Sequence, residues 1–445
     1  MTDSYDLVIT GGRAVTPNGV ETVDLGIRGG RIAALGALEG ARAAQTLDAR
    51  GLHVLPGVID TQVHFREPGL EHKEDLESGT RGAIMGGVTT VFEMPNTRPN
   101  TTGPAEIADK LARARGRAWC DHAFFVGAAM DNVDRLAEAE GVPGCCGVKI
   151  FMGASTGTLL VPDDATLRRA LASGRRRVAI HSEDEPRMNE RRHIAEAAGR
   201  PHAHCEWRDV ESAVRATRRV LAIARELGRQ IHVLHITTEE EIAILAEHRD
   251  IATVEVTPQH LTLSAPECYD RLGTLAQMNP PIREARHREG LWRGVTSGVV
   301  DVLGSDHAPH TLEEKAKTYP QSPSGMPGVQ TLLPVMLDHV HRGRLSLERL
   351  VDLASHGPQR IYNIACKGRL VVGYDADIVL VDLKAKRAVA REWIESKSGW
   401  SPFEGLELTG WPVATILRGQ IVMRDGQRLG VPMGVPARFL DTRAY

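Results

Sequence analysis

The sequence predicts an α/β protein in which a (β/α)8 TIM barrel carries a small composite β-sandwich domain formed by both chain ends. Three observations support this fold class. Strand-like and helix-like segments alternate through the middle of the chain, as they do in barrels of parallel strands. Polar side chains able to do chemistry follow the ends of those strands, where barrel active sites lie. Short alternating strands, separated by glycines, occur at both ends of the chain.

Length, composition and charge agree with this fold. The chain has 445 residues and 42 % hydrophobic residues, enough for a large barrel with an added domain. A net charge of −3 points to no nucleic-acid or anionic-membrane partner. No apolar run approaches the roughly 20 residues that span a bilayer. The first residues lack a signal peptide and the 6 cysteines lack C-x-x-C spacing, so we expect free thiols and a cytoplasmic location.

The chain ends are expected to form one β-domain. Residues 1–55 contain short strand-like segments with alternating apolar and polar residues. The same alternation occurs again at 368–383 and 414–430. We therefore assign 1–55 to the N-terminal part of the sandwich domain and 366–445 to its C-terminal part and tail. Residues 56–365 are left for the barrel.

Eight segments of the middle region are typical of barrel strands. They are 54–65, 89–95, 121–128, 147–152, 177–183, 231–238, 252–258 and 300–309. Helix-like stretches lie between most of them, for example 104–117, 163–171, 209–227 and 239–247. This alternation predicts eight parallel strands with helices outside.

The first barrel strand carries an unusual row of polar residues. Asp60, Gln62, His64 and Arg66 recur at every second position and would share one face of the strand. Burying such a row is costly unless a metal and an anionic substrate satisfy it. The alternative is an edge strand with a solvated polar face.

This stretch, G-V-I-D-T-Q-V-H-F-R-E-P-G, resembles the first strand of the amidohydrolase superfamily, which ends in His-x-His. F-R-E-P-G at 65–69 and M-P-N at 94–96 resemble the dihydroorotase branch in particular. One residue departs from the pattern, because Gln62 stands in place of the first histidine. The resemblance covers essentially the whole chain. It implies reversible, metal-dependent hydrolysis of the cyclic amide of dihydroorotate to N-carbamoyl-aspartate, in pyrimidine biosynthesis.

A metal centre is expected at the strand ends, where three imidazoles and a carboxylate resemble an open zinc site. The resemblance implies one or two zinc ions, with Lys149 carbamylated to bridge them. The implied ligands are His64, Lys149, His181, His235 and Asp306, with Gln62 as an uncertain sixth. Gln62 leaves three outcomes open: a weakly held second metal, a single metal on Lys149, His181 and His235, or a degenerate homologue with a structural role.

The resemblance also implies residues for catalysis and substrate binding. Asp306 would accept the proton of the attacking water and pass it to the leaving nitrogen. The implied substrate contacts are Arg66, Asn96, Asn279 and His310, and the backbone at Pro327 and Gly328. The local alternatives are an Asx-turn at Asn96 and an ion pair of Arg66 with Glu67 or Glu71. His307 either orients Asp306 or packs, and His260 receives no role.

Two other functions remain open at this point. One is a cyclic amidase of the hydantoinase or allantoinase type, with the same metal centre. The other is a non-catalytic, dihydroorotase-like subunit that stabilises a transcarbamoylase partner, for which Gln62 is the sequence support. The expected partners are a small-molecule substrate and a second copy of the chain, and neither nucleic acid nor membrane.

Overall fold

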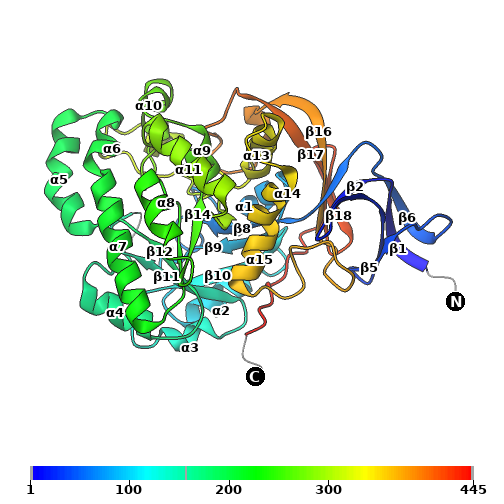
Figure 1. Ribbon diagram of the computed structural model, residues 1–445, viewed down its shortest axis with the longest axis horizontal. Coiled ribbons are helices and arrows are strands. Elements are labelled where there is room, and N and C mark those ends of the chain that lie inside the picture. The colour runs from blue at the N-terminus through cyan, green and yellow to red at the C-terminus, as the bar shows by residue number, and fades with distance from the viewer. Residues whose placement is uncertain (1–3, 156–157, 442–445) are drawn as a thin grey trace.

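The structure is a computed structural model that describes residues 4–155 and 158–441. Its barrel lies at the left of Figure 1, and the first strands of the chain lie at the far right. Strands from the end of the chain lie between the two, next to the barrel. Within the described ranges, no helix combines the length and apolarity needed to cross a membrane.

The predicted barrel is confirmed. Its eight strands form one sheet in the order in which they occur in the chain, and every neighbouring pair is parallel. A parallel bridge from Val63 to His307 joins the first strand to the segment after the last one. The strands are β8 (Val58–Val63), β9 (Val88–Glu93), β10 (Asp121–Gly127), β11 (Cys145–Phe151), β12 (Val178–His181), β13 (Ile231–Val233), β14 (Ala252–Val256) and β15 (Val302–Leu303).

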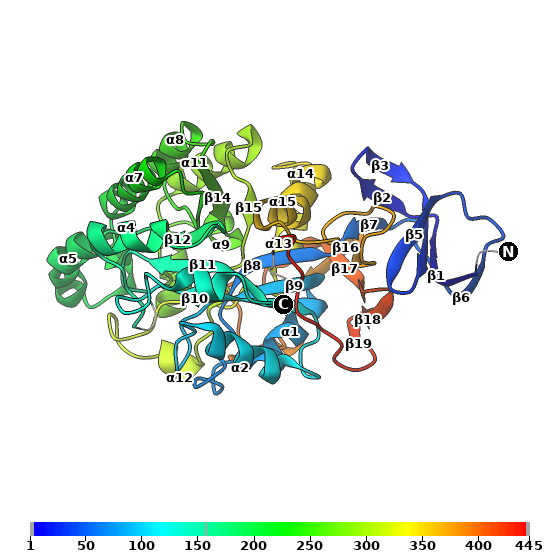
Figure 2. The same ribbon diagram turned by 90° about the horizontal axis from the view of Figure 1, so that it is seen from below.

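Helices cover the outside of the barrel (Figure 2). Those of the first half are α1 (Leu76–Met85), α2 (Pro104–Ala114), α3 (Leu136–Glu140), α4 (Asp164–Ala172), α5 (Glu185–Ala198), α6 (His204–Trp207) and α7 (Val210–Leu227). Those of the second half are α8 (Glu239–Ala246), α9 (Pro258–Thr262), α10 (Glu267–Leu272), α11 (Ala285–Ser297), α12 (Leu312–Lys315), α13 (Leu332–His341), α14 (Leu347–Val351) and α15 (Gly357–Tyr362).

Helix α7 shows why such segments form helices. The side chain of Asp209 accepts the backbone N–H of Ser212 and so satisfies a donor at the start of the helix. The helix ends at Gly228, whose φ of 63° is left-handed and suits glycine. Between them, Val220 and Leu221 are buried against the barrel core.

The composite sandwich is also confirmed. One sheet has the order β5-β4-β1-β6, and the other β19-β18-β17-β16-β7-β2-β3. The strands from the start of the chain are β1 (Ser4–Thr10), β2 (Arg13–Thr16), β3 (Gly19–Thr22), β4 (Asp24–Arg28), β5 (Arg31–Gly36), β6 (Arg42–Asp48) and β7 (His53–Pro56). Those from its end are β16 (Ile378–Ala388), β17 (Glu407–Leu417), β18 (Gln420–Arg424) and β19 (Gln427–Arg428). The two ends meet where β7 pairs antiparallel with β16, with Leu55 opposite Val379.

The segment between β16 and β17 leaves the sandwich and packs on the barrel. Trp400 and Phe403 are buried in one cluster with Met278 and Ile282, which lie between barrel helices α10 and α11. The indole N–H of Trp400 donates to the carbonyl of His310 at 2.8 Å. The segment between β16 and β17 therefore reaches the carboxyl side of the barrel strands, where His310 lies.

Candidate active site

The ends of the barrel strands bring the predicted metal-site residues together in the interior. His64 follows β8, His181 ends β12, His235 follows β13, and Asp306 follows β15. The six predicted ligands are each at most 7 % exposed, and they are Gln62, His64, Lys149, His181, His235 and Asp306. Charged and polar groups buried to this degree need partners.

Asp306 is the centre of the first group. Its Oδ1 accepts the amide N–H of Gln62 at 3.1 Å and lies 3.2 Å from Nε2 of His64. Nδ1 of His64 donates to the side-chain oxygen of Asn96 at 2.8 Å. Burial lowers the pKa of His64, which favours the neutral ring with a lone pair on Nε2. A lone pair then faces a carboxylate oxygen, and a cation would satisfy both.

His181 and His235 form the second group. Nδ1 of His181 lies 3.0 Å from Nε2 of His235, and Nε2 of His181 lies 2.8 Å from a carboxylate oxygen of Glu183. Arg208 holds Glu183 through a bond from Nε to Oε1 of 3.0 Å. A carboxylate behind an imidazole fixes the ring and leaves its other nitrogen for a metal.

Lys149 lies inside the barrel and is fully buried. Burial lowers its pKa to about 7, although the charges of Asp306 and Glu255 act in the opposite direction. Its Nζ has no hydrogen-bond partner among the residues that the structure describes. The same holds for the amide oxygen of Gln62 in the described part of the chain. A buried lysine with a lowered pKa and a buried, unpaired amide oxygen fit a metal centre.

Arg66 lies next to this site and bonds to the loop after β15. Its Nε donates to the carbonyl of Pro309 at 3.1 Å, and its Nη2 lies 3.3 Å from Nε2 of His310. Glu67, one of its alternative partners, instead pairs with Arg117. Burial lowers the pKa of Arg66 to about 10, so the guanidinium remains charged at neutral pH.

The other predicted substrate contacts lie around the same mouth. Asn279 accepts from Nε2 of His204 at 3.0 Å and lines a cleft of about 370 Å³. Asn96 lines a second cleft, of about 380 Å³. The N–H of Gly328 donates to Nδ1 of His307, and its carbonyl accepts from Thr331, so both groups are engaged within the chain. Gly328 thus shapes the loop that also contains Pro327.

A family model described as "Amidohydrolase family" matches residues 53–422. The chain belongs to the amidohydrolase family. It is 38 % identical to the dihydroorotase of Halobacterium salinarum, over 90 % of this chain and 93 % of that protein. It is 33 % identical to the allantoinase of Escherichia coli, over 98 % of this chain and 99 % of that protein. The structure of an L-hydantoinase (dihydropyrimidinase) from Arthrobacter aurescens superposes with a TM-score of 0.93, at 30 % identity, over 97 % and 99 % of the two chains.

Sequence reasoning missed Lys73, which this amidohydrolase places beside His310. Nζ of Lys73 lies 3.1 Å from Nδ1 of His310 and 2.9 Å from Glu314. The His310 ring donates through Nε2 to the carbonyl of Ser324 at 3.0 Å. Ser324 lines the first cleft and Lys73 lines the second, so His310 bonds to a residue of each. Nothing in the sequence around Lys73, a polar loop after the first barrel strand, indicates that the lysine is buried. Its contact with His310 arises only when the chain folds.

Three residues of the amidohydrolase site have left-handed backbones. The φ angles are 66° at Arg66, 35° at His235 and 43° at Asp306. Non-glycine residues adopt this region rarely and at a cost, and functional sites are where such strain collects. At these three positions, which follow β8, β13 and β15, the backbone therefore leaves the strand conformation.

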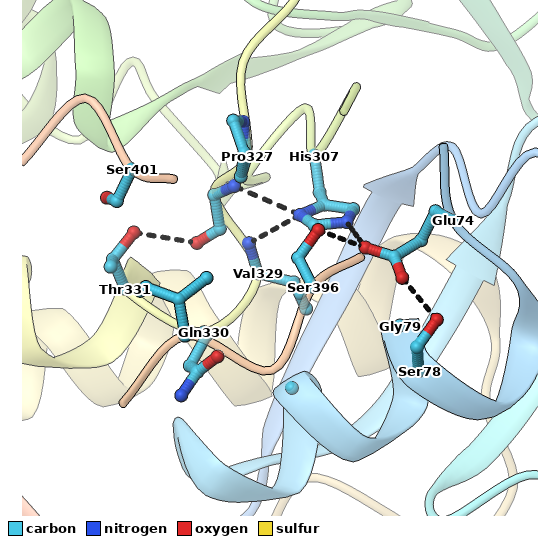
Figure 3. A pocket seen from close by; sticks show the side chains of 13 residues that line it. Glu74, Ser78, Gly79, His307, Pro327, Val329, Gln330, Thr331, Ser396 and Ser401 are labelled. Carbon is cyan, nitrogen blue, oxygen red and sulfur yellow. Dashed lines mark hydrogen bonds and ion pairs between the residues drawn. The ribbon is translucent and has the colours of Figure 1, made fainter. Parts of the chain in front are cut away.

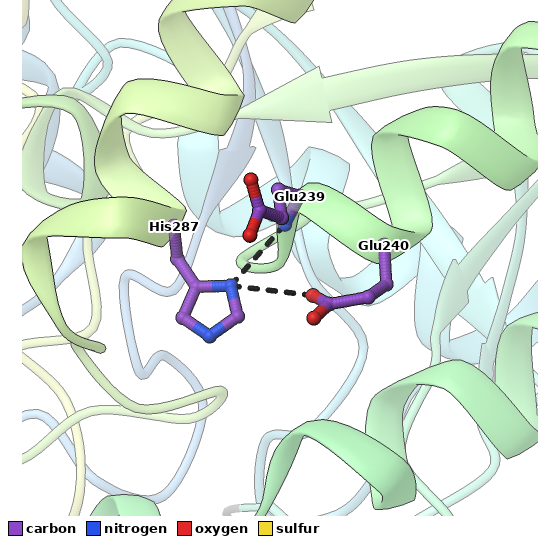
Figure 4. A group of neighbouring side chains, drawn as sticks. All are labelled: Glu239, Glu240 and His287. Carbon is purple, nitrogen blue, oxygen red and sulfur yellow. Dashed lines mark hydrogen bonds and ion pairs between the residues drawn. The ribbon is translucent and has the colours of Figure 1, made fainter.

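Glu239, Glu240 and His287 form a separate cluster with metal-like spacing, shown in Figure 4. Arg286 pairs with both carboxylates and Arg293 pairs with Glu239. Nδ1 of His287 accepts the backbone N–H of Glu239 at 3.3 Å. These ion pairs and this helix-start bond account for the cluster, and it supports no metal site.

Proposed function

We propose that this amidohydrolase is a dihydroorotase that interconverts dihydroorotate and N-carbamoyl-aspartate. The observation that carries the proposal is the buried Arg66 beside His310, two residues after the predicted metal ligand His64. A planar guanidinium suits a carboxylate, and dihydroorotate carries one on its ring. Hydantoin and allantoin lack such a carboxylate.

The proposed metal is zinc, in one or two ions. His64, Lys149, His181, His235 and Asp306 would hold it, with Lys149 carbamylated and the amide oxygen of Gln62 as a weaker ligand. Carbamylation requires a neutral amine, and the lowered pKa of Lys149 supports it. When bound, zinc lowers the pKa of a water molecule and polarises the amide carbonyl of the substrate.

The protein's own groups then position the substrate and move the proton. Arg66 binds the ring carboxylate, next to the ion pair of Lys73 with Glu314. Asp306 accepts the proton of the attacking water and delivers it to the ring nitrogen as the amide bond breaks. The Gln62 amide, bonded to Oδ1 of Asp306, keeps the carboxylate in place. Ring closure follows the same steps in reverse.

A second candidate is a cyclic amidase of the allantoinase or hydantoinase type. The 33 % identity to an allantoinase and the TM-score of 0.93 to an L-hydantoinase favour it. A non-catalytic subunit that supports a transcarbamoylase rests on Gln62 alone. We further propose a homodimer, on the resemblance described above, and a cytoplasmic location, on the free thiols expected from the sequence.

A substrate panel separates these candidates. Purified, zinc-supplemented protein is assayed with dihydroorotate, hydantoin and allantoin at matched concentrations. We expect the highest kcat/KM for dihydroorotate. A higher value for hydantoin or allantoin would replace the proposed function with the second candidate, and no turnover of any of the three by folded protein would favour the non-catalytic one.

A further inference from the structure

His307 follows Asp306 and is 2 % exposed. Its backbone carbonyl accepts the N–H of His64 at 2.7 Å, and its N–H donates to the hydroxyl of Ser305 at 3.1 Å. Bridges join it to Val63 on one side and to Met326 on the other. The backbone of His307 therefore connects the end of the first strand to loop 326–329.

Both ring nitrogens of His307 are engaged, as Figure 3 shows. Nδ1 accepts the backbone N–H groups of Gly328 at 3.1 Å and Val329 at 3.4 Å. Nε2 lies 3.3 Å from a carboxylate oxygen of Glu74. Because Nδ1 accepts, the proton of the neutral ring lies on Nε2 and is donated to Glu74. This fixes one tautomer and one ring orientation.

Glu74 is itself held from two further parts of the chain. Its carboxylate accepts the hydroxyls of Ser78, in α1, and Ser396, in the segment after β16. The cavity beside these residues is about 10 Å³, room for a single water molecule at most. The buried His307–Glu74 pair is therefore no ligand site, and its effect is on the position of what it holds.

We propose that His307 is a positioning residue for the reaction of this site, and that its Nδ1 sets loop 326–329 against the catalytic Asp306. The inference rests on the proposed function, since the loop matters only if substrate binds beside it. Glu74 acts one step further out, by holding the ring so that Nδ1 faces Gly328. The competing explanation is packing alone, through the edge-on contact of the ring with Phe65 at 5.5 Å.

Two substitutions separate the two ring nitrogens. In His307→Asn the short amide oxygen can replace Nδ1 as the acceptor for Gly328 and Val329, but nothing reaches Glu74. In His307→Gln the longer amide can reach Glu74, but two buried N–H groups lose their acceptor. If Nδ1 sets the loop, His307→Gln should raise KM for dihydroorotate at least about tenfold more than His307→Asn does, because an unpaired buried donor is costly.

His339→Gln is the matched control, since His339 is also buried. Within the described residues, the one hydrogen bond of its ring nitrogens joins Nε2 to the Thr262 hydroxyl at 2.9 Å. It should leave KM unchanged, because His339 makes no hydrogen bond to loop 326–329 within the described residues. Equal KM values for the two His307 variants, or a larger effect of Asn than of Gln, would overturn the proposal and leave packing as the explanation.

A second measurement covers the case in which a His307 variant does not fold. Long-range 1H–15N spectra of the unsubstituted protein report which ring nitrogen of His307 carries the proton. We expect Nδ1 bare and Nε2 protonated, with that pattern lost in Glu74→Leu. A ring protonated on Nδ1 would contradict the inference.

Turnover separates a failure of this inference from a failure of the proposed function. If dihydroorotate is not turned over while another cyclic amide is, only the proposed function fails, and the variants are compared on that other substrate. No turnover of any cyclic amide would overturn both.

Discussion

Arg66 is 1 % exposed, and its Nε donates to the Pro309 carbonyl at 3.1 Å. A lysine at this position would keep a positive charge and lose the planar pair of donors. We expect Arg66→Lys to lower kcat/KM for dihydroorotate at least about tenfold and to change turnover of hydantoin much less. Steady-state kinetics on both substrates test this. An equal loss on both would show that Arg66 supports the site without contacting a carboxylate.

In the proposed metal site, Gln62 would determine how many metal ions are held. Its amide oxygen is a weaker zinc ligand than an imidazole, although it is buried and unpaired within the described residues. Gln62→His should therefore bind more zinc per chain than the unsubstituted protein, as measured by elemental analysis after dialysis. The control is Gln259→His, at another buried glutamine, which donates to the Ser305 carbonyl and should leave the zinc content unchanged. Identical zinc content in Gln62→His would contradict a role for position 62 in metal binding.

The site residues differ in how well the sequence predicts them. His64, His181, His235 and Asp306 follow apolar strand segments, and alternation alone places such residues at one mouth. Glu74 and Lys73 could not be predicted, because their partners His307 and His310 lie far away in the chain. Which of these residues act on a substrate is a prediction that the assays test.

At the scale of elements, the segment after β16 reaches the site. Trp400 donates to the carbonyl of His310, and Trp411 makes a comparable bond to Leu408 within its own strand. Alternation and length indicated the barrel strands, although β15 extends only from Val302 to Leu303. The route of the segment after β16 could not be predicted, because its contacts join distant parts of the chain.

This arrangement makes Trp400→Phe a test of the segment. Losing the indole N–H leaves the buried His310 carbonyl without that donor, which should cost about 1–3 kcal/mol of unfolding free energy. We expect KM for dihydroorotate to rise as well, because His310 is displaced. Trp411→Phe should cause a similar loss of stability with KM unchanged. A KM for Trp400→Phe equal to that of Trp411→Phe would show that the segment after β16 does not affect substrate binding.

At the scale of the whole molecule, both chain ends share one hydrophobic core. Val54 from β7 and Leu380 from β16 are buried together in the sandwich. Leu380→Ala should lower the unfolding free energy by about 2–5 kcal/mol, through lost burial and the cavity left behind. Val372→Ala, at an exposed position, should change it by less than about 0.5 kcal/mol. Denaturant unfolding compares the two, and equal losses would argue against the shared core.

The proposed function of the whole molecule is one reaction. The most direct measurement follows dihydroorotate and N-carbamoyl-aspartate in both directions with purified, zinc-supplemented protein, beside Asp306→Asn. We predict interconversion in both directions, slowed at least about 100-fold in the variant because the proton has no carrier. Folded, zinc-loaded protein that converts neither compound would contradict the proposed function, and equal rates in Asp306→Asn would remove that carboxylate from the mechanism.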